Sequence, residues 1–396
     1  MEESGNNLPL AGVRVLDLTQ VVAGPYCTMM LADMGAEIVK IERPGYGDDL
    51  RRTVPYKGRE GHEDYFNALN RSKKSVTLDL KEAQQRDIAL RLAERADVMV
   101  ENFSPGVVTR LGLDWDVVRQ RNARLVFCSL SGFGQSGPYC NRPALDPIIQ
   151  AVTGIMSVTG LPDGEPTMIG APVADVIAGM FAAYAIVNAL RLVTADGGGQ
   201  YIDLSMQDAM LASIGTRMGE TLQAGIAPGR LGNGNPLRVP ANTYRSADDR
   251  YIAMMVHDQA QWKPFCEALE RVEWIDHPQF RTMALRVQNR KAIDAEVARR
   301  IGEHDAVYWR RRFEHFSVPH ALVNNYAQAL EDPQVAHRGL VRELEHAVSG
   351  TIRVVGPPWA MSATKSWLAA PPQLGEHTAE VLKDWLGIEW AGKDPV

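Results

Sequence analysis

Short β-rich runs alternate with helical patterns over the first 130 residues, and this alternation constrains the fold more than any other sequence feature. Helical patterns such as KEAQQRDIALRLAERA separate the runs. A chain in which strands alternate with helices forms a parallel sheet. The sequence therefore predicts an α/β fold whose first strands are GVRVLDLT (12–19), AEIVKIE (36–42), SVTLDL (75–80), DVMVENF (97–103) and RLVFCSL (124–130).

The alternation loosens after residue 195, which indicates a second, smaller domain. A Gly/Pro/Asn-rich connector, GIAPGRLGNGNPLRVPANTY, is typical of a domain boundary. Beyond it we expect a hairpin over 243–256 that turns at Asp248 and Asp249, and helices over 259–314. Strand character returns at 350–362 and helix at 377–387, so we expect the C-terminal segment to rejoin the first domain. The predicted divisions are 1–215, 216–329 and 330–396.

Composition excludes several classes of protein. The hydrophobic fraction of 45% and the charged fraction of 23% are those of a globular chain. With a net charge of −6 and no long run of either sign, nucleic acid is not an expected partner. The first residues lack the pattern of a signal peptide, and the cysteines lie far apart without a CxxC pair. We expect a cytoplasmic protein, without structural disulfides, whose four cysteines are Cys27, Cys128, Cys140 and Cys266.

The most apolar window, 169–193, is long enough to span a bilayer but contains Pro172 and Asp175. We interpret it as a packed interior helix and expect no membrane partner. A buried carboxylate without a partner is costly, so Asp175 needs a reason. One is that it caps a helix over 176–192. Its small neighbours would also admit a substrate, and free amides at a helix start could stabilise an oxyanion.

Other motifs give weaker signals. GFGQSG (132–137) fits the dinucleotide pattern G-x-G-x-x-G, but prolines follow where that fingerprint requires a helix. Cys27 is better explained as a small buried hydrophobe than as a nucleophile. The nine histidines form no HExxH motif, so we expect no metal. Several basic residues follow the predicted strands and together suggest a polyphosphate ligand: Arg43, Arg71, Lys73, Lys74, Lys81 and Arg110.

Eight segments, in order, resemble the class III coenzyme A transferases. This family contains formyl-CoA:oxalate and carnitine CoA transferases and has α-methylacyl-CoA racemase as a relative. The resemblance covers nearly the whole chain, from Leu8 to about Gly387. Its segments are LAGVRVLDLTQVVAGPYCTMMLADMGAEIVKIERP, NRSKKSVTLDLK, ADVMVENFSPGVVTRLGL, LSGFGQSGPY, GAPVADVIAGM, GGGQYIDLSMQDA, DPQVAHRGL and LGEHTAEVL.

The resemblance implies a nucleophilic role for Asp175, which matches the family's catalytic aspartate. Its carboxylate would attack an acyl-CoA thioester and form a mixed anhydride with release of the CoA thiolate. The thiolate would then form an aspartyl-CoA thioester, and an acceptor acid would reverse these steps. The implied reaction uses acyl-CoA and a small carboxylic acid as substrates and needs no permanently bound cofactor. We expect stabilising amides at 134–137 or at the helix start.

The resemblance also implies which residues contact CoA. Arg43, Lys81 and Arg110 are the expected phosphate partners, and the charge pattern had already marked these three. The full set of implied contacts is Gln20, Arg43, Leu78, Lys81, Asn102, Phe103, Arg110 and Met206.

The chain departs from its relatives at the expected acid pocket. Val22 stands where formyl-CoA transferases have glutamine, and the glycine-rich lid loop of those enzymes is replaced by GNGNPLRVPANTY, so formyl-CoA and oxalate are not favoured. Leu145 stands where racemases have a histidine that moves a proton. We expect the pocket to include Val22, Gln135, Asp146 and Arg238, with Arg238 facing the second carboxylate of a dicarboxylic acid.

The family resemblance implies a discontinuous Rossmann-like large domain, a smaller α+β domain and an interlocked homodimer. The leading interpretation is an acyl-CoA:carboxylate CoA transferase. Three alternatives stay open: an α-methylacyl-CoA racemase or isomerase of the same family, a lyase-type member of that family, and a CoA-binding protein without turnover.

Overall fold

The computed structural model describes residues 8–53, 62–194, 197–364 and 367–390, which divide into two compact units. The large unit comprises residues up to 154, 169–219 and those from 336 onward, and the small unit comprises 155–168 and 220–335. Both ends of the chain thus contribute to the large unit. The structure divides the chain after 219 and 335, where the sequence analysis placed divisions after 215 and 329. Residues 155–168 also belong to the small unit, which no sequence pattern indicated.

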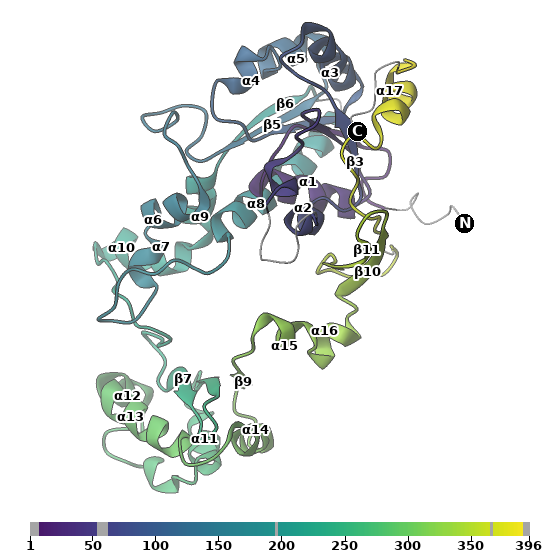
Figure 1. The fold of residues 1–396 in the computed structure, drawn as a ribbon. Helices are drawn as coiled ribbons and strands as arrows, with labels where there is room; N and C mark the ends of the chain where they lie inside the picture. Colours follow the sequence, from purple (N-terminus) through teal and green to yellow (C-terminus); the bar gives the residue numbers. More distant parts are fainter. Residues whose placement is uncertain (1–7, 54–61, 195–196, 365–366, 391–396) are drawn as a thin grey trace. The chain divides into compact units, whose positions relative to one another are not determined.

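A six-stranded parallel sheet forms the centre of the large unit, with the order β3-β2-β1-β4-β5-β6 (Figure 1). This is the strand order of doubly wound folds, in which ligands bind beyond the carboxyl ends of the strands. The five predicted strands are confirmed, and the sixth was not among them. The strands are β1 (Arg14–Asp17), β2 (Glu37–Glu42), β3 (Lys73–Thr77), β4 (Val98–Glu101), β5 (Val126–Ser131) and β6 (Gln200–Ser205).

Helices cover both faces of this sheet, because strands buried on both sides expose apolar side chains in both directions. Leu16, Val39, Met99 and Phe127 share one core cluster with the helices of the first face. These are α3 (Ala83–Arg95), α4 (Val107–Arg110), α5 (Trp115–Arg121) and α17 (Thr378–Leu386). The other face carries α1 (Ala23–Asp33), α8 (Val173–Thr194) and α9 (Met206–Ser213), with η1 (Asp49–Arg51), α2 (Asp64–Leu69) and α6 (Asp146–Val152) nearby.

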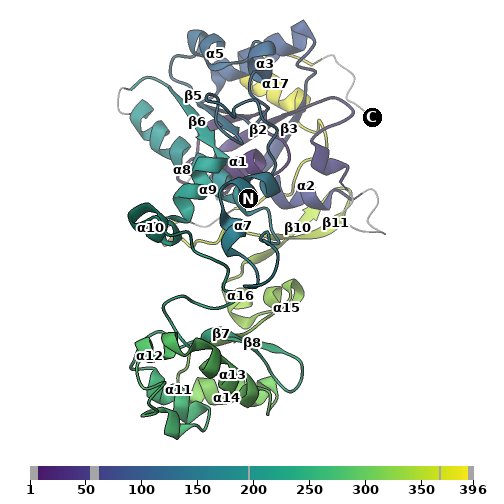
Figure 2. The same ribbon diagram turned by 90° about the vertical axis from the view of Figure 1, so that its left-hand side faces the viewer.

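Helix α8 is apolar and long enough to cross a membrane by length and composition alone. It packs against α1, β5 and β6 in the large unit (Figure 2). Its buried residues are mostly small, such as Ala178, Gly179 and Ala182, which allows a close approach of α1. The opposite side exposes large apolar side chains, and Tyr184 is 70% exposed.

The C-terminal segment lies along β3, an edge strand of the sheet. The N–H of Ser72 donates to the carbonyl of Ala369 (3.0 Å), and the N–H of His377 donates to the carbonyl of Ser75 (2.9 Å). Farther along, the N–H of Thr77 donates to Oγ1 of Thr378 (3.1 Å). An antiparallel hairpin of β10 (Val341–His346) and β11 (Gly350–Val355) precedes this segment. Residues from 336 onward thus belong to the large unit.

The small unit has its own sheet, three antiparallel strands in the order β7-β8-β9. The predicted hairpin is confirmed and turns at Asp249, which has φ 61°. Its core is aromatic, with Trp262, Phe265, Trp309 and Phe313. Its strands are β7 (Ala241–Arg245), β8 (Tyr251–Met255) and β9 (His320–Leu322). Its helices are α7 (Ile155–Val158), α11 (Trp262–Ala268), η2 (Val272–Trp274), α12 (Met283–Gln288), α13 (Arg290–Ile301), α14 (Ala306–His315) and α15 (Tyr326–Leu330). The chain divides between the two units within α10 (Gly215–Ala224) and within α16 (Pro333–His337).

Candidate active site

The carboxyl edge of the large sheet gathers most of the predicted site residues. Because all six strands are parallel, the loops that follow them emerge at this one edge. Each of the six strands is followed within ten residues by at least one predicted residue. Gln20 and Val22 follow β1, Arg43 follows β2, and Leu78 and Lys81 follow β3. Asn102, Phe103 and Arg110 follow β4, Gln135 follows β5, and Met206 follows β6.

Asp175 lies in the first turn of α8, and its position corrects the sequence-based capping hypothesis. The helix begins at Val173, not at residue 176, so Asp175 is inside the helix and does not cap it. Pro172 precedes the first helical residue, a position at which no helical hydrogen bond requires its N–H. Asp175 is half-buried, beside the fully buried Ala174.

The cap of α8 comes instead from Asp146, which is 8% exposed. Its Oδ2 accepts the N–H of Ala174 (2.8 Å) and the N–H of Asp175 (3.2 Å). Its Oδ1 accepts Nε2 of Gln150 (2.6 Å), one turn along α6. Asp146 therefore holds the helix start that carries Asp175. These two amides are engaged, so they are not free to stabilise an oxyanion as the sequence analysis expected.

The electrostatics of Asp175 differ from those of a surface carboxylate. Burial, followed by the nearby charge of Asp146, raises the pKa of Asp175 to about 7. Among the residues that the structure describes, none donates a hydrogen bond to its carboxylate. An aspartate with few donors around its oxygens is poorly solvated and hence more reactive toward a carbonyl carbon when ionised.

Gly179 fixes the distance between α8 and α1. A Cβ at this position would lie 2.6 Å from the carbonyl oxygen of Ala23 and 3.2 Å from Cβ of Tyr26. Since Asp175 precedes Gly179 by one helical turn, both lie on the same side of α8. Asp175 is thus on the side of α8 that packs toward the start of α1, just after Val22.

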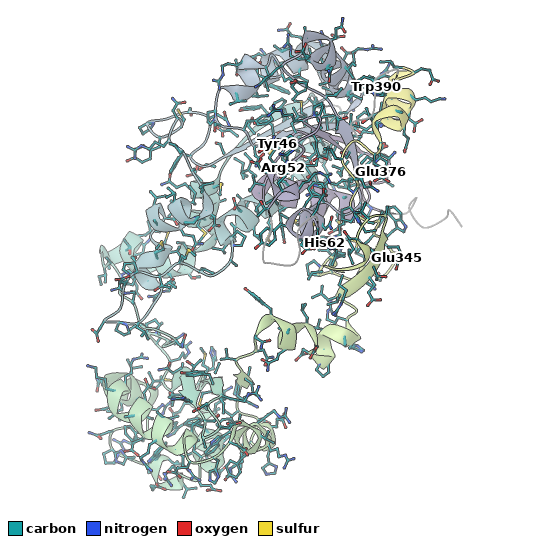
Figure 3. The ribbon with its side chains drawn as sticks, viewed as in Figure 1. Tyr46, Arg52, His62, Glu345, Glu376 and Trp390 are labelled. Atoms are coloured by element: carbon teal, nitrogen blue, oxygen red, sulfur yellow. The ribbon has the colours of Figure 1, made fainter. Side chains whose placement is uncertain are left out.

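Three of the predicted phosphate partners are available for a ligand. Arg43, Lys81 and Arg110 are exposed, and no carboxylate of the described residues pairs with them. Arg43 lies over the ring of Tyr46, with 5.4 Å from its guanidinium carbon to the ring centroid. Arg52 lies over the same ring at 3.9 Å, as Figure 3 shows for Tyr46 and Arg52. The loop after β2 therefore presents two guanidinium groups around one aromatic ring.

The other three basic residues of the predicted set serve the fold, which corrects their inclusion. Arg71 is buried and forms a two-pronged ion pair with Asp33 (2.9 and 2.5 Å). Lys73 is buried and donates to Asp17 (3.2 Å), to Thr28 and to Asn70. Lys74 pairs with two glutamates, Glu37 (2.9 Å) and Glu380 (2.7 Å). The sequence alone could not separate these paired cations from the unpaired ones.

Leu78 and Met206 are only 1% and 5% exposed, so both residues offer little surface to CoA. Phe103 is partly buried against the core, and its N–H donates to the carboxylate of Glu101 (2.9 Å). Burial raises the pKa of Glu101 to about 7, although the bond from the N–H of Phe103 acts to lower it. Glu101 was not identified from the sequence, where it reads as the end of a strand.

The loop 132–137 contributes Gln135, whose N–H donates to both carboxylate oxygens of Asp203 (3.1 Å each). This amide is consequently engaged, so among the amides of 134–137 it is not a free oxyanion donor. The side-chain Nε2 of Gln135 is buried and lacks a hydrogen-bond partner among the described residues. No helix follows the loop before Asp146, as the prolines predicted.

The remaining predicted pocket residues divide between the two units. Val22 is half-buried and immediately precedes α1, in the large unit. Leu145, the position of the racemase histidine, is 70% exposed. Arg238 belongs to the small unit, where its Nε is buried without a partner among the described residues.

A cavity of about 500 Å³ lies at the other, amino edge of the large sheet. The first residues of β2 and β3 form one wall, and residues 345–347 and 367–377 form another. Glu345 and Glu376 belong to this wall (Figure 3). Of the predicted basic set, Lys73 and Lys74, which pair with carboxylates, line this cavity, whereas Asp175 and the implied CoA contacts do not. In the part of the chain that the structure describes, no group of three or more His, Cys, Asp or Glu could hold a metal ion.

Comparison with known proteins identifies the family. A family model described as CoA-transferase family III matches residues 10–378. The chain belongs to CoA-transferase family III. Within this family, the chain is 36% identical to succinyl-CoA:glutarate CoA-transferase of Homo sapiens, over 96% of this chain and 87% of that one. It is 35% identical to acetyl-CoA:oxalate CoA-transferase of Acetobacter aceti, over 96% of this chain and 97% of that one.

A solved structure of the same family has the same fold. The crystal structure of a CaiB/BaiF family protein from Brucella suis superposes with a TM-score of 0.87 at 32% identity, over 96% of this chain and 100% of that one. The predicted α/β fold and the predicted family are thereby confirmed, and the chain is a CoA transferase.

Proposed function

We propose that this protein transfers CoA from an acyl-CoA donor to a small free carboxylic acid, with Asp175 as the nucleophile. The observation that carries the proposal is the half-buried, weakly solvated carboxylate of Asp175 at the sheet edge where unpaired cations gather. Arg43, Lys81 and Arg110 would bind the phosphates of CoA, and loop residues from Gln20 to Met206 would hold the rest.

In the proposed mechanism, an Asp175 oxygen attacks the thioester carbon, and the C–S bond breaks to give an acyl-aspartyl anhydride and CoA thiolate. The thiolate attacks the aspartyl carbon of the anhydride, and the donor acid leaves as a carboxylate. The acceptor carboxylate then attacks the resulting aspartyl-CoA thioester, and the thiolate leaves. Finally, the thiolate attacks the acceptor's carbonyl carbon in the new anhydride, which yields the new acyl-CoA and regenerates Asp175. Atoms and charge balance without a redox or metal cofactor.

We propose short dicarboxylic acids as the carboxylate substrates. The relatives include enzymes named for succinate, glutarate, oxalate and mesaconate. Arg238, which the sequence analysis expects to face the second carboxylate, belongs to the small unit, and its buried Nε has no partner among the described residues. Val22, in place of a glutamine, favours a donor larger than formyl-CoA.

The proposal includes a homodimer, interlocked as in the resembling family. Exposed apolar side chains on α8 and α6 support it, because large apolar side chains at helical spacing on an exposed face often mark an interface between proteins. These side chains include Met180, Tyr184 and Leu192 on α8 and Ile148 and Val152 on α6. The four free cysteines, three of them buried, are consistent with a reducing cytoplasm.

The test combines a substrate screen with one variant. Succinyl-CoA and glutaryl-CoA are incubated with a panel of free acids, and new acyl-CoA species are identified by mass spectrometry. The variant Asp175→Asn should still bind CoA but lose transfer by several orders of magnitude, since an amide cannot form the anhydride. In the native enzyme, acyl-CoA with hydroxylamine should convert Asp175 to its hydroxamate. Substantial transfer by Asp175→Asn, with no adduct on that peptide, would contradict the mechanism.

A further inference from the structure

The side chain of Asn102 extends the pairing between β1 and β4 beyond the ends of both strands. The last backbone bond between them runs from the N–H of Leu18 to the carbonyl of Val100 (2.9 Å). Oδ1 of Asn102 then accepts the N–H of Gln20 (2.8 Å), and Nδ2 of Asn102 donates to the carbonyl of Gln20 (2.8 Å). The amide group thus acts as one more peptide of the neighbouring strand and fixes both polar groups of Gln20.

The next residue, Val21, has a left-handed backbone conformation with φ 66°. For a β-branched residue this region is a genuine outlier, and such conformations are strained. They persist only where the surrounding structure fixes them. The side chain of Val21 is 39% exposed, so packing of that side chain does not account for the conformation.

A second anchor holds Val21 from the other side. Its N–H donates to Oδ1 of Asp48 (3.2 Å). Asp48 is itself fixed, because Lys40 forms an ion pair with it (3.0 Å) and its N–H donates to Glu42 (3.0 Å). All three of these charged side chains are buried. Val21 is therefore held on one side by Asn102, which binds the neighbouring Gln20. On the other side it is held by a direct bond to Asp48 in the buried charged cluster.

The residues that follow Val21 begin α1. The N–H of Tyr26 donates to the carbonyl of Val22 (2.8 Å), which starts the helix. Ala23, one residue on, is the residue whose carbonyl oxygen closely approaches Gly179, one turn from Asp175. A rotation at Val21 would move this helix start and hence the wall beside Asp175.

We infer that Asn102 is a positioning residue that keeps Val21 in its left-handed conformation and so sets the start of α1 beside Asp175. This assignment differs from a direct contact between the Asn102 side chain and CoA, because both polar atoms of that side chain already bind Gln20. The expected effect of Asn102 on kcat rests on the proposed function. The clamp itself, the two hydrogen bonds from Asn102 to Gln20 that hold Val21 in its conformation, does not depend on catalysis.

A double-mutant cycle with Val21→Gly tests the assignment. Glycine adopts the left-handed region without penalty, so Gly at position 21 should remove the need for the clamp. In the native background we expect Asn102→Ala to lower kcat by about 10- to 100-fold, the scale of a small misplacement in an active site. In the Val21→Gly background most of that loss should disappear, and the Tm decrease caused by Asn102→Ala should also shrink.

Other outcomes overturn the assignment. Equal losses of kcat in both backgrounds would mean that Asn102 and Val21 are uncoupled. An equal rise in the Kd for CoA in both backgrounds, with little change in kcat, would mean that Asn102 contacts CoA. If the native protein shows no transfer, the proposed function fails, but the Tm values still measure the coupling on their own.

Asn122→Ala is the matched control. The amide of Asn122 also binds backbone carbonyls in the large unit, those of Ala93 (3.1 Å) and Ala96 (2.8 Å). It has no recorded bond to Val21 or Gln20. Its effect on Tm should therefore be the same with and without Val21→Gly. Rescue of Asn122→Ala by Val21→Gly would show a general stabilisation and contradict the clamp.

Discussion

The carboxylate of Asp146 accepts the backbone N–H of Asp175, with 3.2 Å between Oδ2 and the nitrogen. One aspartate thus holds the backbone of another while its negative charge acts on the second carboxyl. The two effects are separable by mutation, because an amide keeps the hydrogen-bond acceptor and removes the charge.

Asp146→Asn should shift the acid limb of the kcat/KM profile to lower pH, since the charge of Asp146 helps to raise the pKa of Asp175. Asp146→Ala should in addition lower Tm by about 2 °C, because loss of a helix cap costs about 1 kcal/mol. Profiles of kcat/KM against pH and thermal melts of both variants check this. An unchanged acid limb in Asp146→Asn would show that the two carboxyls do not interact.

The raised pKa of Asp175 predicts a cost in stability. Burial and Asp146 raise this pKa from 3.8 to about 7, so the folded state binds the proton more tightly than the unfolded state. The favourable contribution is complete below about pH 4 and is lost as pH rises through 7. Asp175→Asn should therefore raise Tm at pH 8 relative to the native enzyme, and this gain should diminish toward pH 4. A gain that does not vary with pH would refute the linkage.

Gly179→Ala should be harmful although alanine favours helices. The added methyl would lie 2.6 Å from the carbonyl oxygen of Ala23, so α1 and α8 would have to separate. Overpacking of this kind typically costs about 1–3 kcal/mol. We expect a lower Tm together with reduced kcat, because the wall beside Asp175 shifts. Gly219→Ala in α10, where the added methyl contacts nothing within 4 Å, is the control and should lower neither value.

Arg43→Ala and Arg110→Ala should each weaken CoA binding while the fold remains intact. Neither guanidinium has a carboxylate partner among the described residues, so their removal leaves no buried charge unpaired. Titration calorimetry with CoA measures the Kd, and we expect increases of about tenfold for each lost phosphate contact. Arg119→Ala, an exposed residue of α5 that pairs with Asp116, provides the control. Unchanged Kd values in both test variants would remove these arginines from the site.

Incubation of a chiral 2-methylacyl-CoA in heavy water should give no deuterium at the α-carbon. Leu145 has no proton to transfer, and it is 70% exposed rather than directed into a protected site. Mass spectrometry of the recovered thioester measures the exchange. Incorporation at a catalytic rate would favour the racemase alternative and would require another residue as the base.

The strands were predictable from the sequence because buried parallel strands are local runs of Val, Ile and Leu. The predicted run 36–42 and the observed strand Glu37–Glu42 differ by one residue. β6 was missed because polar residues, Gln200 and Asp203, interrupt its apolar ones. The start of α8 was placed too late because the capping group is Asp146, 29 residues away from Asp175, and no local pattern records that contact.

The same limit applies to the site. Asp175 was identifiable because a carboxylate in an apolar helix is rare, and Arg43 because it follows a strand directly. Lys73 has the same sequence signature but is buried in a network with Asp17. The clamp between Asn102 and Gln20 joins residues 82 apart, so only the folded chain reveals it.

The hydrogen bonds between β3 and residues 369–378 also determine when the large unit can be completed during synthesis. Helix α17, with Val381, Leu382 and Trp385, fills part of the core beneath the first strands, yet the ribosome makes it after all of these strands. The core of the small unit, from Val239 to Val318, leaves the ribosome earlier. A nascent chain therefore has a finished small unit while the edge of its large sheet is still uncovered, and that edge must be protected from other chains until residues 369–378 have been made.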